Sequence, residues 1–157
     1  MRRDRPLVAA IKRDFRHAIR LDRPTLFALF HAIIELAIAR VCLSTRQAQE
    51  LLEPHRASPI RKAARLGRTE PSALLDDVSF AIPRMGARVP WRADCLVQAL
   101  AAQRWLRNRG VATSLVIGIR KLTPADFEAH AWLMAGERVV SGGEVSSYHT
   151  VFKQQAH

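Results

Sequence analysis

The sequence is poor in cysteine, glycine and proline. Only two of its 157 residues are cysteines, Cys42 and Cys95, and no Cys-x-x-Cys or clustered His/Cys spacing occurs. This excludes a disulfide framework and the common zinc motifs, and it favours a reducing compartment. The 7 glycines and 8 prolines, in a chain that is 48% apolar, exclude a disordered chain. The length suits one domain with a buried core.

Acidic residues are also scarce. The chain has 14 Asp and Glu against 25 Lys and Arg, a formal net charge of +11, which bears on partners and solubility rather than on fold. No RNP, KH or zinc-finger pattern is present, so nucleic-acid binding would rest on charge alone and we expect no specific nucleic-acid partner. A solvated basic surface, an anionic membrane surface and an acidic peptide partner remain open as explanations of the charge.

The N-terminus lacks the pattern of a signal peptide. Residues 1–17 contain neither a continuous apolar core nor a small-residue cleavage site, so we expect a cytoplasmic protein. The apolar spacing over residues 7–21 predicts an amphipathic helix with a basic back. We expect this helix to pack on the domain; contact with a membrane or a partner is the alternative.

The most apolar stretch is residues 26–43. It is shorter than the roughly 20 apolar residues of a spanning helix and carries His31, Glu35 and Arg40, which a bilayer core tolerates poorly. We therefore predict a buried core helix with one polar edge, on which His31 and Glu35 share a face because they are four residues apart. Cys42, near its end, is expected to pack as a small apolar residue.

The remaining first half is also predicted to be helical. We expect a short helix over residues 45–52, a basic stretch over 56–68, and a helix over 71–85 whose end Pro83 disturbs. The domain prediction is a helical region over residues 1–86.

In the second half, residues 87–157, the spacing of apolar residues changes from that of a helix to that of strands. Residues 94–109 predict a helix that stops at Asn108-Arg109-Gly110. Residues 113–121, 129–134 and 137–141 predict three strands, the last two joined by a turn at Ala135-Gly136. The fold class is therefore α+β, with a helix packed on a small antiparallel sheet, and the two regions should form one compact unit.

Cys95 stands at the first turn of its predicted helix, directly after the natural N-cap Asp94. The helix dipole and Arg92 favour a thiolate at that position. The first-turn N–H groups could also receive the oxyanion of an attacked carbonyl. The alternative is that Cys95, like most free cysteines, only fills space in the core.

His130 is the candidate base for this thiol. On a strand it shares a face with Trp132 and Met134, and beside the Cys95 helix it could accept the thiol proton. The alternative is that His130, like most single histidines, only packs in the core or at the surface.

A third group should orient the imidazole. A two-residue turn at Ala135-Gly136 would place Ser141 opposite His130, and a three-residue turn would place Gly142 there. The nearest downstream acid is Glu144, in the segment SGGEVS. Glu144 is our first candidate, Ser141 the second, and a bare Cys–His dyad the third.

Two segments resemble a known family. They are VPWRADCLVQALAAQRWLRNRGVATSLVIGIRK and AHAWL…AGERVVSGGE, within residues 88–152. They resemble the transglutaminase-like family that includes the leader peptidases of lasso-peptide biosynthesis, of the microcin-processing B-protein type. The most specific pieces are WRADCL, LRNRGV, LVIGIRK and HAW.

The resemblance implies a papain/transglutaminase-like core and a cysteine protease without metal or cofactor. It matches Cys95 with the nucleophile and His130 with the general base. The family's third residue is an Asp, which this sequence lacks, so Glu144 substitutes or the triad is degenerate. Trp91 would line the acyl site, supply an indole N–H, or simply pack.

The resemblance also implies partners. Such peptidases cut the leader from a precursor peptide so that a ring-forming cyclase can use the new N-terminus. Some carry a fused recognition domain, which the helical first half does not predict, so a separate leader-recognition protein is expected. The alternatives are an acyltransferase with the same Cys–His site and a catalytically impaired protein that binds partners.

Overall fold

The computed structural model describes residues 23–45, 71–123 and 126–156. The helices predicted over residues 7–21 and 45–52 and the basic stretch 56–68 lie outside these residues, apart from Thr45. The described chain contains the helices α2 (Arg23–Thr45), α4 (Pro71–Gly86) and α5 (Cys95–Arg107), and the strands β1 (Thr113–Lys121), β2 (Phe127–Ala135), β3 (Arg138–Ser141) and β4 (His149–Ala156). It is an α+β fold, as predicted.

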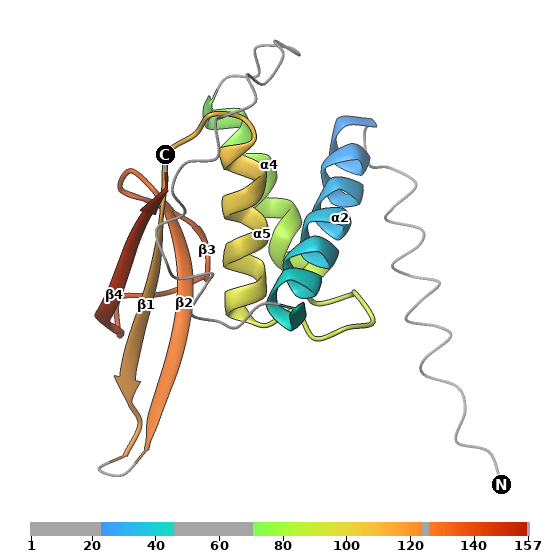
Figure 1. Ribbon diagram of the computed structural model, residues 1–157. Helices are drawn as coiled ribbons and strands as arrows, with labels where there is room; N and C mark the ends of the chain where they lie inside the picture. Colours follow the sequence, from blue (N-terminus) through green and yellow to red (C-terminus); the bar gives the residue numbers. More distant parts are fainter. Residues whose placement is uncertain (1–22, 46–70, 124–125, 157) are drawn as a thin grey trace, which may run out of the picture.

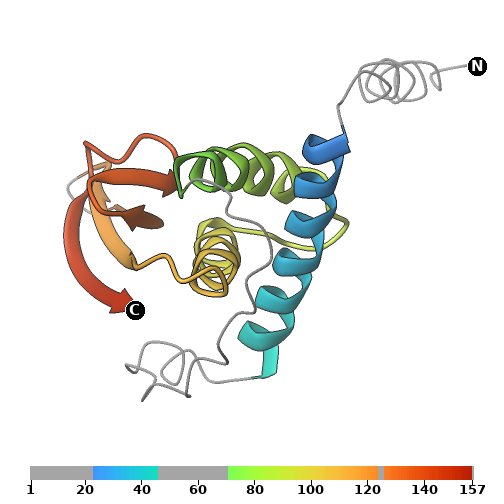
Figure 2. The ribbon, with the colours of Figure 1, turned by 90° about the horizontal axis from the view of Figure 1, so that it is seen from above.

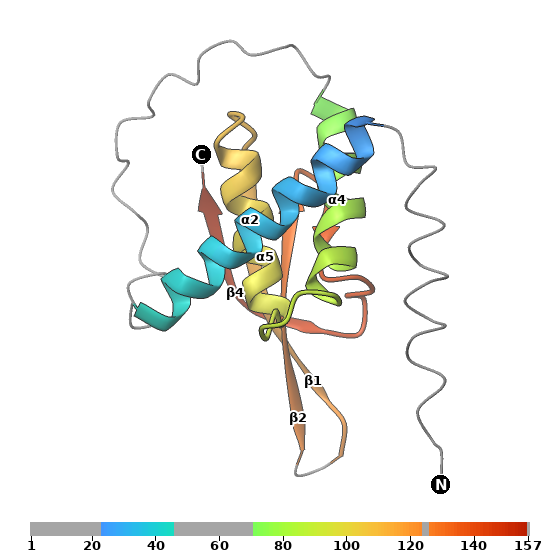
Figure 3. The ribbon, with the colours of Figure 1, turned by 90° about the vertical axis from the view of Figure 1, so that its right-hand side faces the viewer.

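The elements form three layers (Figures 1 and 2). The antiparallel sheet is the first layer, α4 and α5 form the second, and α2 packs on those two helices from the far side. Figure 3 shows α2 crossing both of them obliquely. One hydrophobic cluster connects all three layers, so the core continues from α2 and α4 into the sheet.

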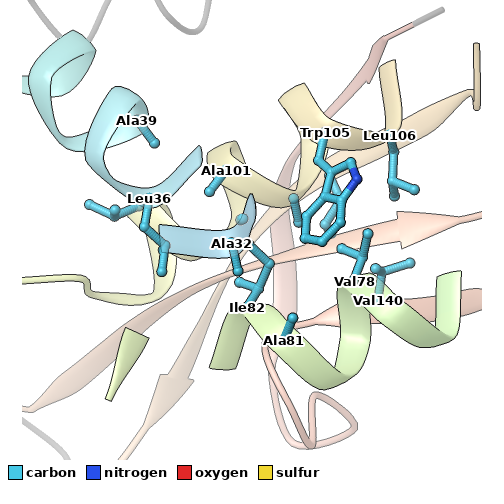
Figure 4. Packing of buried hydrophobic residues seen from close by; sticks show 14 of the residues in the cluster. Ala32, Leu36, Ala39, Val78, Ala81, Ile82, Ala101, Trp105, Leu106 and Val140 are labelled. Carbon is cyan, nitrogen blue, oxygen red and sulfur yellow. The ribbon is translucent and has the colours of Figure 1, made fainter. Parts of the chain in front are cut away.

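Small residues let the helices approach closely. Ala28, Ala32 and Ala39 of α2 are buried, and Figure 4 shows Ala32 and Leu36 beside Ile82 and Ala101. Full burial of a side chain such as Leu36 contributes about 1.5–3 kcal/mol. The prediction of a core helix over this stretch is therefore confirmed for one side of α2.

The polar edge of α2 is confirmed as well. The His31 Nε2 and Glu35 Oε1 atoms are 3.2 Å apart, and Arg104 of α5 donates through Nε to Glu35 Oε2 at 2.8 Å. Glu35 is only 3% exposed. A buried carboxylate is tolerated because it is paired and hydrogen-bonded.

The other side of α2 is apolar and exposed. Phe27 and Phe30 are the most exposed of its large apolar side chains, with Leu26, Ile34 and Val41 along the same helix. By length and composition α2 is the one described helix that could cross a membrane, a property that core helices and signal sequences share.

The helix α5 begins and ends as its sequence predicts. Asp94 is the N-cap, with extended backbone, and its Oδ1 accepts a hydrogen bond from Val97 N at 3.2 Å. The helix ends at Arg107, and the chain turns at Gly110, which has φ +75°. The helix α4 continues past Pro83 to Gly86, slightly beyond its predicted end.

The sheet has the order β3-β2-β1-β4. The first strand is confirmed at its predicted bounds, 113–121. The fourth strand, β4, was not predicted; it pairs antiparallel with β1, so β1 is an inner strand rather than an edge. Residues Leu115, Leu133 and Val140 belong to the core cluster shared with the helices.

The hairpin between β2 and β3 differs from the prediction. Ala135 pairs with Arg138, so the turn residues are Gly136 and Glu137 rather than Ala135 and Gly136. A register shift after Met134 then pairs Leu133 with Ser141. The predicted pairing of His130 with Ser141 is therefore wrong, because the turn lies one residue later, which shifts the pairing by two positions, and the bulge shifts it by one more.

Candidate active site

Cys95 is a free, half-buried cysteine at the first position of α5. The cap uses two first-turn amides, since Val97 N donates to the Asp94 side chain and Gln98 N to the Asp94 carbonyl. Among the described residues no acceptor is found for the amides of Cys95 and Leu96. These N–H groups and the positive end of the helix dipole favour negative charge beside the thiol.

The positive charge of Arg92 faces the N-cap residue Asp94. Its Nε lies 3.8 Å from Asp94 Oδ2, and both side chains are exposed. The cation therefore faces the cap, and an exposed pair of this kind has little energetic weight.

Trp91 packs against the core cluster, four residues before Cys95. Its indole Nε1 is buried and has no acceptor among the described residues. A buried N–H without a partner is uncommon in proteins. The structure therefore shows the packing role of Trp91, with its indole N–H enclosed by the protein.

The imidazole of His130 is fixed by a backbone carbonyl. Its Nε2 lies 2.7 Å from the carbonyl oxygen of Gly142. A carbonyl oxygen can only accept, so Nε2 carries the proton. In the neutral ring Nδ1 then holds the lone pair and is the basic nitrogen.

Gly142 can hold this position because it is glycine. Its φ is +114°, and an added Cβ would lie 2.3 Å from the Cβ of Trp132. Any other residue here would have a strained backbone, and its side chain would collide with Trp132.

Tyr148 packs against the imidazole from the segment that precedes β4. The two ring centroids are 5.0 Å apart. The Tyr148 hydroxyl donates to Glu128 Oε1 at 2.9 Å, and Arg120 binds Glu128 Oε2. The Arg120 guanidinium also lies 4.9 Å from the centre of the Tyr148 ring, a cation–π distance.

These contacts set the ionisation of the cluster. Hydrogen bonds from Arg120 and then Tyr148 lower the pKa of Glu128 below its usual value. Burial first, and then the hydrogen bond to Glu128, raise the pKa of Tyr148. The negative charge of Cys95 is a further, smaller cause of the raised pKa of Tyr148.

That last effect connects the two predicted catalytic residues. No hydrogen bond joins Cys95 and His130 in the part of the chain that the structure describes. Tyr148 interacts with both residues: its ring packs against the His130 imidazole, and the charge of Cys95 is among the causes that raise the pKa of Tyr148.

The structure does not bring Glu144 or Ser141 to His130. Glu144 is exposed, and its Oε1 accepts from Ser146 N at 2.9 Å; this backbone bond lowers the pKa of Glu144. Ser141 is buried opposite Leu133, and its hydroxyl has no partner among the described residues. The Gly142 carbonyl holds the position that a third residue would take.

Sequence reasoning missed Arg120, Glu128 and Tyr148. Glu128 could have been found, because it lies two residues before His130 and so on the same face of the strand. Tyr148 could not, since its place depends on β4, which was not predicted. Among the described residues, no group of three His, Cys, Asp or Glu side chains could hold a metal ion.

Residues 39–153 match the transglutaminase-like superfamily, well over half of the chain. The chain belongs to this superfamily. The match begins within α2, so it extends far beyond the segments over residues 88–152 that carry the resemblance in the sequence. Members are generally cysteine-dependent peptidases or acyltransferases. No curated protein and no solved structure matches the chain significantly.

Proposed function

We propose that this protein is a cysteine peptidase that removes the leader from a ribosomally made precursor peptide, with Cys95 as nucleophile and His130 as general base. The observation that carries the proposal is the bond between His130 Nε2 and the Gly142 carbonyl. It leaves Nδ1 as the basic nitrogen, in a superfamily whose members generally use a cysteine.

The reaction follows from these groups. Nδ1 of His130 accepts the thiol proton, and the Cys95 sulfur attacks the carbonyl carbon at the junction between leader and core. The amides of Cys95 and Leu96 at the start of α5 donate to the oxyanion. The core's amine leaves with the proton from His130, and water then hydrolyses the leader thioester on Cys95.

The substrate class and the partners rest on the resemblance of the motifs around Cys95 and His130. They are the precursor peptide, a separate protein that recognises the leader, and a ring-forming cyclase. The net charge of +11 would suit an acidic leader or partner. We propose a cytoplasmic location, where a ribosomal product and a free catalytic thiol would meet.

The test is mass spectrometry of the precursor peptide encoded beside this protein, incubated with the recognition protein and the peptidase. Wild type should give one cut, and Cys95→Ala and His130→Ala should give none. Cys42→Ser is the matched control, a free cysteine at the far end of α2, and should cut normally. Equal cutting by wild type and Cys95→Ala would contradict the proposal.

Acyl transfer is the second candidate, because the superfamily includes acyltransferases. The same thioester would then be attacked by an amine instead of water. Adding hydroxylamine to the incubation separates the two reactions: a transferase gives mainly the hydroxamate of the leader, and a peptidase mainly the free acid. No product from either nucleophile, with a folded protein, would favour a catalytically impaired member that binds partners.

A further inference from the structure

We propose that Glu128 and Tyr148 are positioning residues for His130 and together replace the acid that the triad lacks. Glu128, anchored by Arg120, holds the Tyr148 ring against the imidazole, and the ring keeps Nε2 on the Gly142 carbonyl. This inference rests on the proposed function, since it concerns the residue that acts as the base there.

Tyr148 is held from three sides. Its hydroxyl is bonded to Glu128, the Arg120 guanidinium lies against its ring, and its ring lies against His130. Arg120 is held in turn by Glu128 and by Ser147 Oγ at 3.4 Å. A ring fixed in this way restricts the imidazole beside it, whereas an unanchored ring would not.

The sheet has no side chain at its central position beside His130, Gly118. Gly118 of β1 pairs with His130 on one side and with Thr150 on the other. A Cβ at Gly118 would lie 2.7 Å from the ring of Trp132 and 2.9 Å from the His149 carbonyl. Without a side chain at this central position, β1 leaves room for the Trp132 ring and for the backbone at His149, where the chain enters β4 directly after Tyr148.

A backbone carbonyl does less for a catalytic histidine than a carboxylate does. A triad carboxylate both fixes the tautomer of the histidine and stabilises its positive form. The Gly142 carbonyl fixes the tautomer but carries no net charge. Glu128 is the carboxylate on the same face of β2 as His130; its pKa is lowered first by the hydrogen bonds from Arg120 and Tyr148 and, as the smallest cause, by the charge of His130.

The first experiment compares carboxylates. Glu128→Gln removes the charge and keeps an acceptor for the Tyr148 hydroxyl; Glu137→Gln, at the exposed β2–β3 turn, is the matched control. We expect kcat for precursor cleavage to fall about 10- to 100-fold in Glu128→Gln with KM little changed, and no change in the control. A comparable fall in Glu144→Gln, with Glu128→Gln unaffected, would overturn the inference.

The second experiment separates the ring from its hydroxyl. Tyr148→Leu should lower kcat more than Tyr148→Phe, because Phe keeps the ring beside His130. The double variant Tyr148→Phe/Glu128→Gln should lose less than the sum of the two single effects, since both act through one unit. Additive effects of the two substitutions would contradict a shared role.

A third measurement does not depend on activity. Tyr148 is the single tyrosine of the chain, so tyrosinate absorbance reports it alone. Arg120, Glu128 and Cys95 are the charged groups that act on it. Its titration should lie above that of free tyrosine and move down in Glu128→Gln and, by less, in Cys95→Ser. If neither substitution shifts the titration of Tyr148, the proposed positioning role of Glu128 and Tyr148 is wrong.

These outcomes keep the two proposals apart. If Cys95→Ala abolishes cleavage but the Glu128 and Tyr148 variants cut normally, the peptidase stands and the positioning role is wrong. If Cys95→Ala cuts normally, the peptidase is wrong, and the titration of Tyr148 still decides whether Glu128 holds it. Circular dichroism and thermal unfolding confirm that each variant is folded.

Discussion

Two clusters in this protein use the same residue types for different ends. At the junction of α2 and α5, His31, Glu35 and Arg104 meet around Trp105, with the imidazole and indole stacked 4.4 Å apart. On the sheet, His130, Glu128 and Arg120 meet around Tyr148. We call them the helix cluster and the sheet cluster.

The difference lies in what each histidine contacts. In the helix cluster, His31 bonds the carboxylate of Glu35, which is buried and also bonded to Arg104. In the sheet cluster, the carboxylate bonds tyrosine and arginine, and His130 bonds a backbone carbonyl. The first arrangement ties two helices together, whereas the second leaves Nδ1 of His130 available to a reacting group.

The largest effect expected from this comparison is on catalysis. His130→Ala should lower kcat for precursor cleavage by about 10²- to 10⁴-fold, the usual contribution of a general base, while the thermal midpoint changes little. His31→Ala should lower the thermal midpoint and leave kcat unchanged, because the His31 imidazole only stacks and bonds within the helix cluster. Kinetics and thermal unfolding of both variants would check this; loss of activity in His31→Ala with normal stability would break the comparison.

The next effect is on stability. Glu35→Ala leaves Arg104 without its buried partner and should lower the free energy of unfolding by about 1–3 kcal/mol. Glu128→Ala should lower it much less, because Glu128 is half-exposed and water can solvate Arg120. Urea unfolding of the two variants measures the contrast, and equal losses would mean that the sheet cluster is also chiefly structural.

Two neighbouring glycines sharpen the same point. Gly142→Ala should cost about 1–3 kcal/mol of strain and also lower activity, because the new Cβ would press on Trp132 and move the carbonyl that holds His130. Gly143 has φ +69° with no atom near its Cβ position, so Gly143→Ala should cost about 1 kcal/mol and spare activity. Similar activity in both variants would argue against a role for the Gly142 carbonyl.

The smallest effect is on the pH dependence of stability. The pKa of Glu128 is lowered by its hydrogen bonds with Arg120 and Tyr148. A lowered pKa in the folded state stabilises the fold above the usual carboxyl pKa, near 4.3, and that contribution is lost as the pH falls through the folded value. The stability of wild type should therefore approach that of Glu128→Gln as the pH falls below the usual carboxyl pKa; a constant difference would contradict the pairing.

The sequence predicted the elements whose signals are local. Asp94 before an apolar helix, the β-branched run at residues 113–121, and the i, i+4 pair of His31 and Glu35 depend only on neighbouring residues, and all three are found. The hairpin turn lies one residue later than predicted, because Ala135-Gly136 and Gly136-Glu137 both contain the glycine that such a turn needs.

The partner of His130 depends on non-local structure. Glu144 is the nearest downstream acid along the chain, but the bulge after Met134 and the positive φ of Gly142 decide which group lies beside the imidazole. Tyr148 reaches His130 only because β4 returns beside β1. Neither feature has a signature in the residues around His130.

The most direct test of the cysteine–histidine site is the alkylation of Cys95 by iodoacetamide, followed by mass spectrometry with Cys42 as the internal reference. Cys95 lies at the first position of α5, whereas Cys42 lies near the end of α2. We expect Cys95 to be alkylated faster than Cys42 at neutral pH in wild type, and no faster than Cys42 in His130→Ala. Equal alkylation rates for the two cysteines in wild type, unchanged by His130→Ala, would contradict the cysteine–histidine site.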